Sequence, residues 1–150
     1  MTNPRAFAAA LALLLITATP LLAQQPSAAG RIKVASGSAF IVRQSVMIPA
    51  QAGQLVFEAD GLQTGADGRI GVTLKDDTRV SLGPSSELRL ERFAYAPAEG
   101  GLGLVIKFVN GVAAYVSGRI AKLAPDSIRL ETPAAIVGVR GTSLAIRVEP

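Results

Sequence analysis

The sequence predicts an all-β domain, built as a short β-solenoid or a roll of stacked short strands, with a β-sandwich as the alternative. Three observations support this prediction. Apolar and polar residues alternate over several short runs, residues that favour turns separate these runs, and no long stretch beyond residue 30 has helical periodicity. An N-terminal signal helix is expected to precede the domain.

Three runs show the alternation most clearly: residues 69–74, 87–91 and 143–148. Every second residue in each run is apolar, so the apolar side chains leave the same face of the pleat. Each run is therefore predicted to be a strand with one buried and one solvated face.

Residues with turn-forming chemistry lie between the runs. Asp, Asn, Gly or Pro occur in pairs at residues 60–61, 67–68, 76–77, 83–84 and 110–111. Gly, Asn and Asp tolerate positive φ, and Pro fixes φ near a turn value. The Asn-Gly pair at 110–111 predicts a hairpin that joins strands at residues 102–109 and 112–116.

Two repeated patterns underlie the solenoid prediction. Gly-Arg-Ile begins at Gly30, Gly68 and Gly118, and residues 84–91 resemble residues 125–131. In one interpretation every strand simply begins with a Gly turn, an exposed Arg and a buried Ile. In the other the chain coils, and corresponding strands with their charged residues lie side by side in successive turns.

The N-terminus indicates export. A single charge at Arg5 precedes a run of mainly Ala and Leu, and small residues end that run, which is the pattern of a secretory signal peptide. We expect residues 1–23 to be the signal peptide, residues 24–30 a linker and residues 31–150 one all-β domain. Retention of the apolar run as a membrane anchor is the alternative. The expected location is periplasmic or secreted.

Composition argues against catalysis and against nucleic-acid binding. The chain has no His and no Cys, which removes the usual nucleophile pairs and zinc ligands, and we expect no cofactor and no metal. Its basic residues are scattered, and its aromatics are five Phe and two Tyr. Asp76, Asp77, Glu87 and Glu91 are interpreted as solvated charges rather than as a catalytic pair.

Four motifs together resemble the FecR-domain family. They are Thr-Gly-Ala-Asp-Gly-Arg-Ile at 64–70, Asp-Asp-Thr at 76–78, Gly-Pro-Ser-Ser at 83–86, and a closing Thr-Pro followed by Val-Arg-Gly-Thr within 132–142. Asp77 stands where the family often has Gly. The resemblance covers roughly residues 51–148.

The resemblance implies an extracytoplasmic all-β domain that contacts another protein. The best-known members of the family are iron-uptake signal transducers, which combine a cytoplasmic sigma-regulating segment, one membrane span and this periplasmic domain. Only residues 1–5 precede the apolar run here, so we expect no sigma-regulating role. A signalling or cell-envelope adaptor without catalytic activity is the predicted function. The alternative is a carbohydrate- or peptidoglycan-binding module. Sugar sites usually have exposed aromatic side chains, and here Tyr95 and Tyr115 are the only Tyr residues, with no Trp.

The closing motif supplies the candidate site residues Arg140, Gly141 and Thr142. In a structural interpretation, Gly141 permits a tight bend, Arg140 pairs with an acid such as Glu131, and Thr142 bonds the turn. In a functional interpretation, Arg140 presents its guanidinium to a carboxylate or phosphate of a partner.

Overall fold

The structure, a computed structural model, describes residues 23–139 and 143–149. The predicted signal peptide lies outside the described residues except for Ala23, and the site residues Arg140, Gly141 and Thr142 lie outside them entirely. Within the described part of the chain, no helix is long and apolar enough to cross a membrane.

Strands dominate the described residues. In chain order the strands are β1 (Gly30–Ser36), β2 (Ala39–Arg43), β3 (Val46–Pro49), β4 (Leu55–Val56), β5 (Gly61–Thr64), β6 (Arg69–Leu74), β7 (Arg79–Leu82), β8 (Glu87–Ala96), β9 (Gly101–Val116), β10 (Ile128–Glu131), β11 (Ile136–Gly138) and β12 (Ser143–Val148). The helical segments are η1 (Pro97–Glu99), α1 (Arg119–Leu123) and η2 (Pro125–Ser127).

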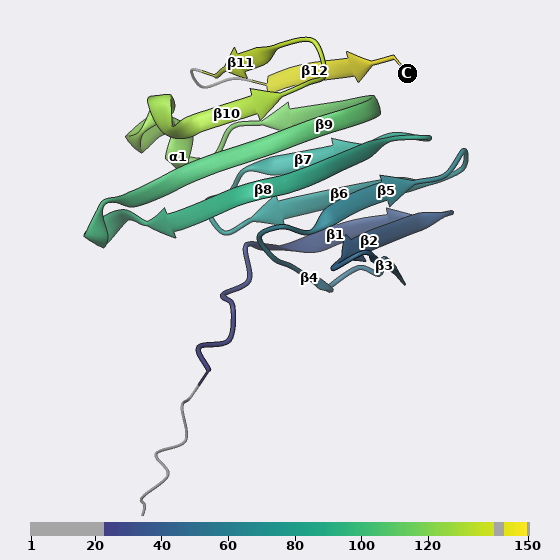
Figure 1. The fold of residues 1–150 in the computed structure, drawn as a ribbon, viewed down its shortest axis with the longest axis horizontal. Helices are drawn as coiled ribbons and strands as arrows, with labels where there is room; N and C mark the ends of the chain where they lie inside the picture. Colours follow the sequence, from purple (N-terminus) through teal and green to yellow (C-terminus); the bar gives the residue numbers. More distant parts are fainter. Residues whose placement is uncertain (1–22, 140–142, 150) are drawn as a thin grey trace, which may run out of the picture.

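The strands form one open sheet that curls into two layers, like half of a barrel (Figure 1). The first layer has the order β4, β1, β6, β7, the second half of β9, and β12. The second layer has the order β3, β2, β5, β8, the first half of β9, β10 and β11. An all-β fold is thus confirmed.

Stacked solenoid coils are not what the described strands form. Paired strands run antiparallel except β9 and β10, whereas stacked coils would pair corresponding strands in parallel. The two similar segments, 84–91 and 125–131, supply β8 and β10, and β9 lies between them. The chain instead passes back and forth between the two layers. We call each point where it passes from one layer to the other a crossing, and the turn residues described below allow these crossings.

One crossing lies inside β9, and there the predicted hairpin is wrong. Residues 102–116 belong to a single strand, which bends at Gly111 with φ of 91° as it leaves the second layer for the first. A Cβ at Gly111 would lie 2.5 Å from the Ser86 Cα, so only glycine fits. The Ser86 hydroxyl accepts a hydrogen bond from the Val112 amide at 2.8 Å and supports the bend.

A second crossing joins β7 to β8 through the Gly-Pro-Ser-Ser turn at 83–86. Thr64 ties this turn to the crossing at 65–68 that follows β5. Its hydroxyl donates to the Gly83 carbonyl at 2.7 Å and accepts from the Ser86 amide at 2.9 Å. These motif residues therefore serve the corner where the sheet folds over.

A third crossing, at 37–38 between β1 and β2, lies against the turn at 65–68. The Ser38 amide donates to the Asp67 carboxylate at 3.2 Å. Hydrogen bonds from Ser38 lower the pKa of Asp67, because they stabilise its ionised form.

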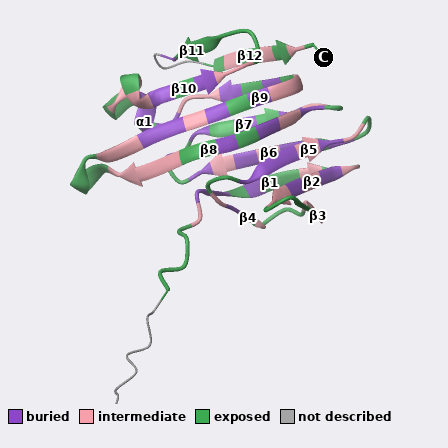
Figure 2. Cartoon of the chain, viewed as in Figure 1, coloured by how far each residue is buried: buried purple, intermediate pink, exposed green. Residues whose placement is uncertain are grey.

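The core lies between the two layers (Figure 2). Inward positions of both layers are apolar, and the small gap between them is lined by Val72 and Val80 from the first layer and by Leu88 and Ile106 from the second. Tyr115 is fully buried at 0% exposure, and this burial raises the pKa of its phenol.

The Gly-Arg-Ile tripeptides begin β1 and β6 as predicted, but the third begins α1. Asp76 is the reason: its carbonyl accepts from the Arg119 amide at 2.6 Å and its carboxylate accepts from the Ile120 amide at 3.3 Å. Ile is buried and Arg exposed in all three copies. The pattern therefore predicted burial correctly and the third element wrongly.

Candidate functional site

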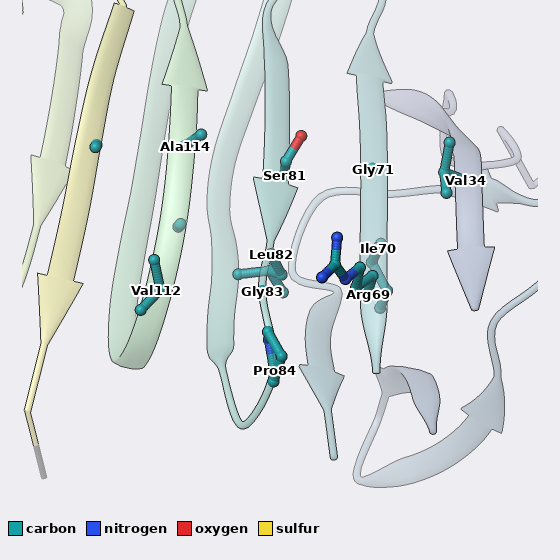
Figure 3. A pocket seen from close by; sticks show the side chains of 12 residues that line it. Val34, Arg69, Ile70, Gly71, Ser81, Leu82, Gly83, Pro84, Val112 and Ala114 are labelled. Carbon is teal, nitrogen blue, oxygen red and sulfur yellow. The ribbon is translucent and has the colours of Figure 1, made fainter. Parts of the chain in front are cut away.

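The outer face of the first layer carries a row of small residues. Strand register places one residue from each of five neighbouring strands side by side: Val34, Gly71, Ser81, Ala114 and Ala145. All of them except Val34 are small, and we call these five residues the small-residue row. All five line a shallow groove of about 500 Å³. Figure 3 shows the labelled members of the row lying across adjacent strands.

Arginines flank this row on both sides. Arg69 of β6 and Arg147 of β12 lie two residues to one side of the row, in register with Gly83 and Val112. Arg31 of β1 and Arg79 of β7 lie on the other side.

All four arginines are exposed. The guanidinium of Arg69 reaches from β6 toward the end of β7 (Figure 3). The small-residue row and the four arginines Arg31, Arg69, Arg79 and Arg147 together are called the basic face below.

The arginines of the basic face lack acidic partners within the described residues. Arg69, Arg79 and Arg147 make no ion pair there, while Arg31 donates to the Gly53 carbonyl at 2.8 Å. No Asp or Glu occurs in the row of small residues or in the two rows beside it. The face therefore presents guanidinium donors and positive potential to whatever approaches it.

The outer face of the second layer has mixed charge instead. Arg89 on β8, Lys107 on β9 and Glu131 on β10 share one row, and Arg129 lies 3.9 Å from Glu131. Exposed pairs of this kind contribute on the order of 0–1 kcal/mol and mainly keep a surface soluble.

An ion pair between half-buried Arg43 and buried Asp60 stabilises the end of the second layer. The Arg43 guanidinium donates to both carboxylate oxygens of Asp60, at 2.8 and 2.7 Å, and Asp60 is only 2% exposed. The hydrogen bond with Asp60 raises the pKa of Arg43. The guanidinium also stacks 4.7 Å from the centre of the Phe57 ring. This arrangement fixes the turn before β5, and its groups are already satisfied by one another.

The predicted solvation of Asp76 is wrong, whereas that of Asp77 is correct. Asp76 is 0% exposed, and its carboxylate accepts from the Thr78 hydroxyl at 2.7 Å and from the Thr78 amide at 3.1 Å. Asp77 is exposed, has φ of 68° and pairs with Arg119 at 2.9 Å. A left-handed φ explains why glycine suits this position in the family.

The remaining predicted groups do not form a site within the described residues. Tyr115 is buried, so of the two tyrosines only the half-buried Tyr95 exposes part of its side chain. No cluster of three or more His, Cys, Asp or Glu occurs in the described part of the chain. Arg140, Gly141 and Thr142 lie outside the described residues and directly precede β12, which carries Arg147 of the basic face.

The sequence analysis missed the basic face. Alternation within β6 indicated that Arg69 and Gly71 point outward, which was the available signal. The face itself depends on the pairing of five strands, and its residues are spread over the sequence from Arg31 to Arg147.

Comparison with known proteins identifies the family of the chain. Residues 60–150 match the family model described as FecR protein, so the chain belongs to the FecR family. The matched region begins at the buried Asp60 and includes the crossings at 65–68 and 83–86. No curated protein and no solved structure matches the chain.

Proposed function

We propose that this protein is a non-catalytic, extracytoplasmic interaction domain that binds an envelope protein through its basic face. It would act as a signalling or cell-envelope adaptor. Membership of a signalling-related family supports this proposal. The observation that carries it is the groove of small residues flanked by four exposed arginines with no acid in the same rows.

Physical chemistry gives such a face a role in binding rather than in folding. Small side chains leave the sheet surface open to close approach by another chain, which is how a groove gains contact area. Like charges with no acid in the same rows repel one another and do not stabilise the folded domain. A complementary partner removes that repulsion, so the face gains stabilisation only in a complex.

Export and the closing motif complete the proposal. Residues 1–23 would direct the chain out of the cytoplasm, giving a periplasmic or secreted protein. Residues 24–28 would link them to the domain, a shorter linker than the predicted 24–30, because Ala29 is buried in the core and Gly30 begins β1. Arg140, Gly141 and Thr142 would extend the contact from β12, or else shape the bend before it.

Site-specific photocrosslinking in the native cell envelope tests the proposal. A photoreactive side chain at Ser81 lies in the groove, and one at Arg89 on the outer face of the second layer is the control. We expect one recurrent protein adduct from position 81, absent from position 89, and lost when Ala114→Trp fills the groove. Equal adducts at both positions, or none, would overturn the proposal.

Two further arms separate the alternatives. Adducts only to cell-wall glycan would favour the carbohydrate- or peptidoglycan-binding module instead. Arg140→Ala, checked for folding by circular dichroism, tests the closing motif. Loss of the adduct in a folded Arg140→Ala protein would include the motif in the contact, and persistence would support its structural interpretation.

A further inference from the structure

The geometry of the basic face also points to a class of partner, an inference that rests on the proposed function. We propose that the groove binds an extended acidic polypeptide segment, which lies across the strands along the small-residue row. Its carboxylates alternate between the Arg69 and Arg147 side and the Arg31 and Arg79 side. Its backbone and small side chains lie over the floor between them.

The length of the row sets the length of the segment. The row crosses five strands, from β1 to β12. Strands lie about 4.8 Å apart, so the row is about 19 Å long. An extended chain rises about 3.3 Å per residue, and about six residues therefore fill it.

The spacing of the arginines sets the spacing of the acids. Arg69 and Arg147 are three strands apart, about 14 Å, which is close to the distance between residues i and i+4 of an extended chain. The two flanking rows are four residues apart along β6, about 13 Å. Successive side chains of an extended segment point to opposite sides, so neighbouring acids reach opposite flanks.

A polypeptide fits this surface better than a phosphate group or a sugar. Phosphate sites gather several donors around one point, whereas these guanidinium groups are distributed around an apolar floor. Sugar sites use exposed aromatic rings, and none lines the groove among the residues that the structure describes. Of these lining residues, Ser81 alone carries a hydroxyl, and the floor otherwise suits Ala, Gly or Ser side chains.

Fluorescence anisotropy with the purified protein tests the inference at low salt. The probe is a labelled hexapeptide, Asp-Asp-Ala-Ala-Asp-Asp, whose acids at positions i and i+4 match the spacing of Arg69 and Arg147. Two controls are Asp-Asp-Asp-Asp-Ala-Ala, with the same charge and different spacing, and Lys-Lys-Ala-Ala-Lys-Lys. We expect the matched peptide to bind more tightly than both controls, and added salt to weaken it.

Matched charge-reversal variants locate the binding. A double variant that combines Arg69→Glu with Arg147→Glu should weaken binding of the matched peptide about tenfold, because two exposed ion pairs become repulsive. The pair Arg89→Glu with Arg129→Glu makes the same change in net charge on the other face and should change binding less than about twofold. Ser81→Trp, which alters no charge, should also weaken binding by filling the groove. Thermal melts check that each variant is folded.

Three outcomes would overturn the inference. They are equal loss in both charge-reversal pairs, no binding of the matched peptide, or pair-specific binding of dextran sulfate or phosphatidylglycerol vesicles without binding of the peptide. The crosslink at position 81 separates this failure from failure of the proposed function. An adduct that persists without peptide binding refutes only the acidic partner, whereas peptide binding without any envelope adduct refutes the proposed function.

Discussion

The outer face of the first layer and the outer face of the second layer cover the same core, and β9 contributes to both. On the second layer, charges of both signs share rows, as Arg89, Lys107 and Glu131 do. On the first layer, four arginines flank a row of small residues without any acid in those rows. Folding needs apolar inward positions from both layers but makes no such demand on the outward ones. We infer from this difference that the outer face of the first layer serves binding, as proposed above, and the variants below test that inference.

A substitution at the bend of β9, the strand that both layers share, should have the largest effect on stability. Gly111→Ala places a Cβ 2.5 Å from the Ser86 Cα at φ of 91°, whereas Gly53→Ala meets nothing within 4 Å at φ of 90°. The left-handed strain of about 1–2 kcal/mol is common to both variants. Overpacking against backbone should add about 1–3 kcal/mol or more at position 111 alone. Urea unfolding measures both, and equal losses would contradict the proposed role of the Ser86 contact.

Substitution of two adjacent aspartates, Asp76 and Asp77, should have the next largest effect on stability. Asp76→Asn should lower the free energy of unfolding by about 2 kcal/mol, because the amide cannot accept all the hydrogen bonds that the buried carboxylate receives from Thr78 and Ile120. Asp77→Asn removes one exposed ion pair with Arg119 and should change it by less than about 1 kcal/mol.

Chemical denaturation of these two proteins compares a buried anchor with an exposed charge in the same turn. The Asp76 carboxylate connects the first layer to α1, which leads to β10 of the second layer. If Asp76→Asn were as stable as Asp77→Asn, the start of α1 would be determined by something other than this carboxylate.

Local pattern predicted part of the fold well. Alternation placed β6 at 69–74 and β12 at 143–148 because their inward positions face the core in a strict period of two. It failed at Asn110 and Gly111. A hairpin and a bend can both place Gly111 at positive φ, and the choice depends on Ser86, which is distant in sequence. The prediction of stacked solenoid coils was wrong for a similar reason. The sequences of β8 and β10 are similar, but that similarity does not reveal that β9 lies between them.

The candidate site was less accessible to prediction. The adjacent residues Arg140, Gly141 and Thr142 form a visible motif, whereas the basic face is assembled from five strands. Its register also depends on a bulge in β1, between Ile32 and Val34, that brings Val34 opposite Gly71. A bulge of this kind has no reliable signal in one sequence, because it depends on the partner strand.

A glycine on each outer face gives a smaller but more specific test. Gly71 lies in the small-residue row, and a Cβ there would make only ordinary contacts at 3.6 Å or more. Gly71→Ala should therefore stabilise the domain by about 0.5–1 kcal/mol, because glycine loses more chain entropy on folding. It should also weaken binding in the groove. Gly138 of β11 has nothing within 4 Å, so Gly138→Ala should stabilise similarly and leave binding unchanged.

Thermal melts and the peptide-binding assay measure the two effects separately. A gain in stability with loss of binding at position 71 only would mean that the row is kept small for its partner. Loss of stability in Gly71→Ala would instead indicate that the row is small because the sheet requires it.

The smallest expected effect concerns pH and the corner between the layers. Hydrogen bonds from Ser38 lower the pKa of Asp67, so the folded state favours the ionised carboxylate more than the unfolded state does. This contribution is present above about pH 4, the ordinary range for Asp, and is lost as the pH falls through the lower pKa of the folded state. The Asp67→Asn variant lacks this titrating carboxyl group.

Melting temperatures from pH 6 to pH 3 should therefore fall more steeply for the wild-type protein than for Asp67→Asn. Parallel curves would show that the crossings at 37–38 and 65–68 stay together without this carboxylate, leaving Thr64 and Ser86 as the side chains that fix the corner.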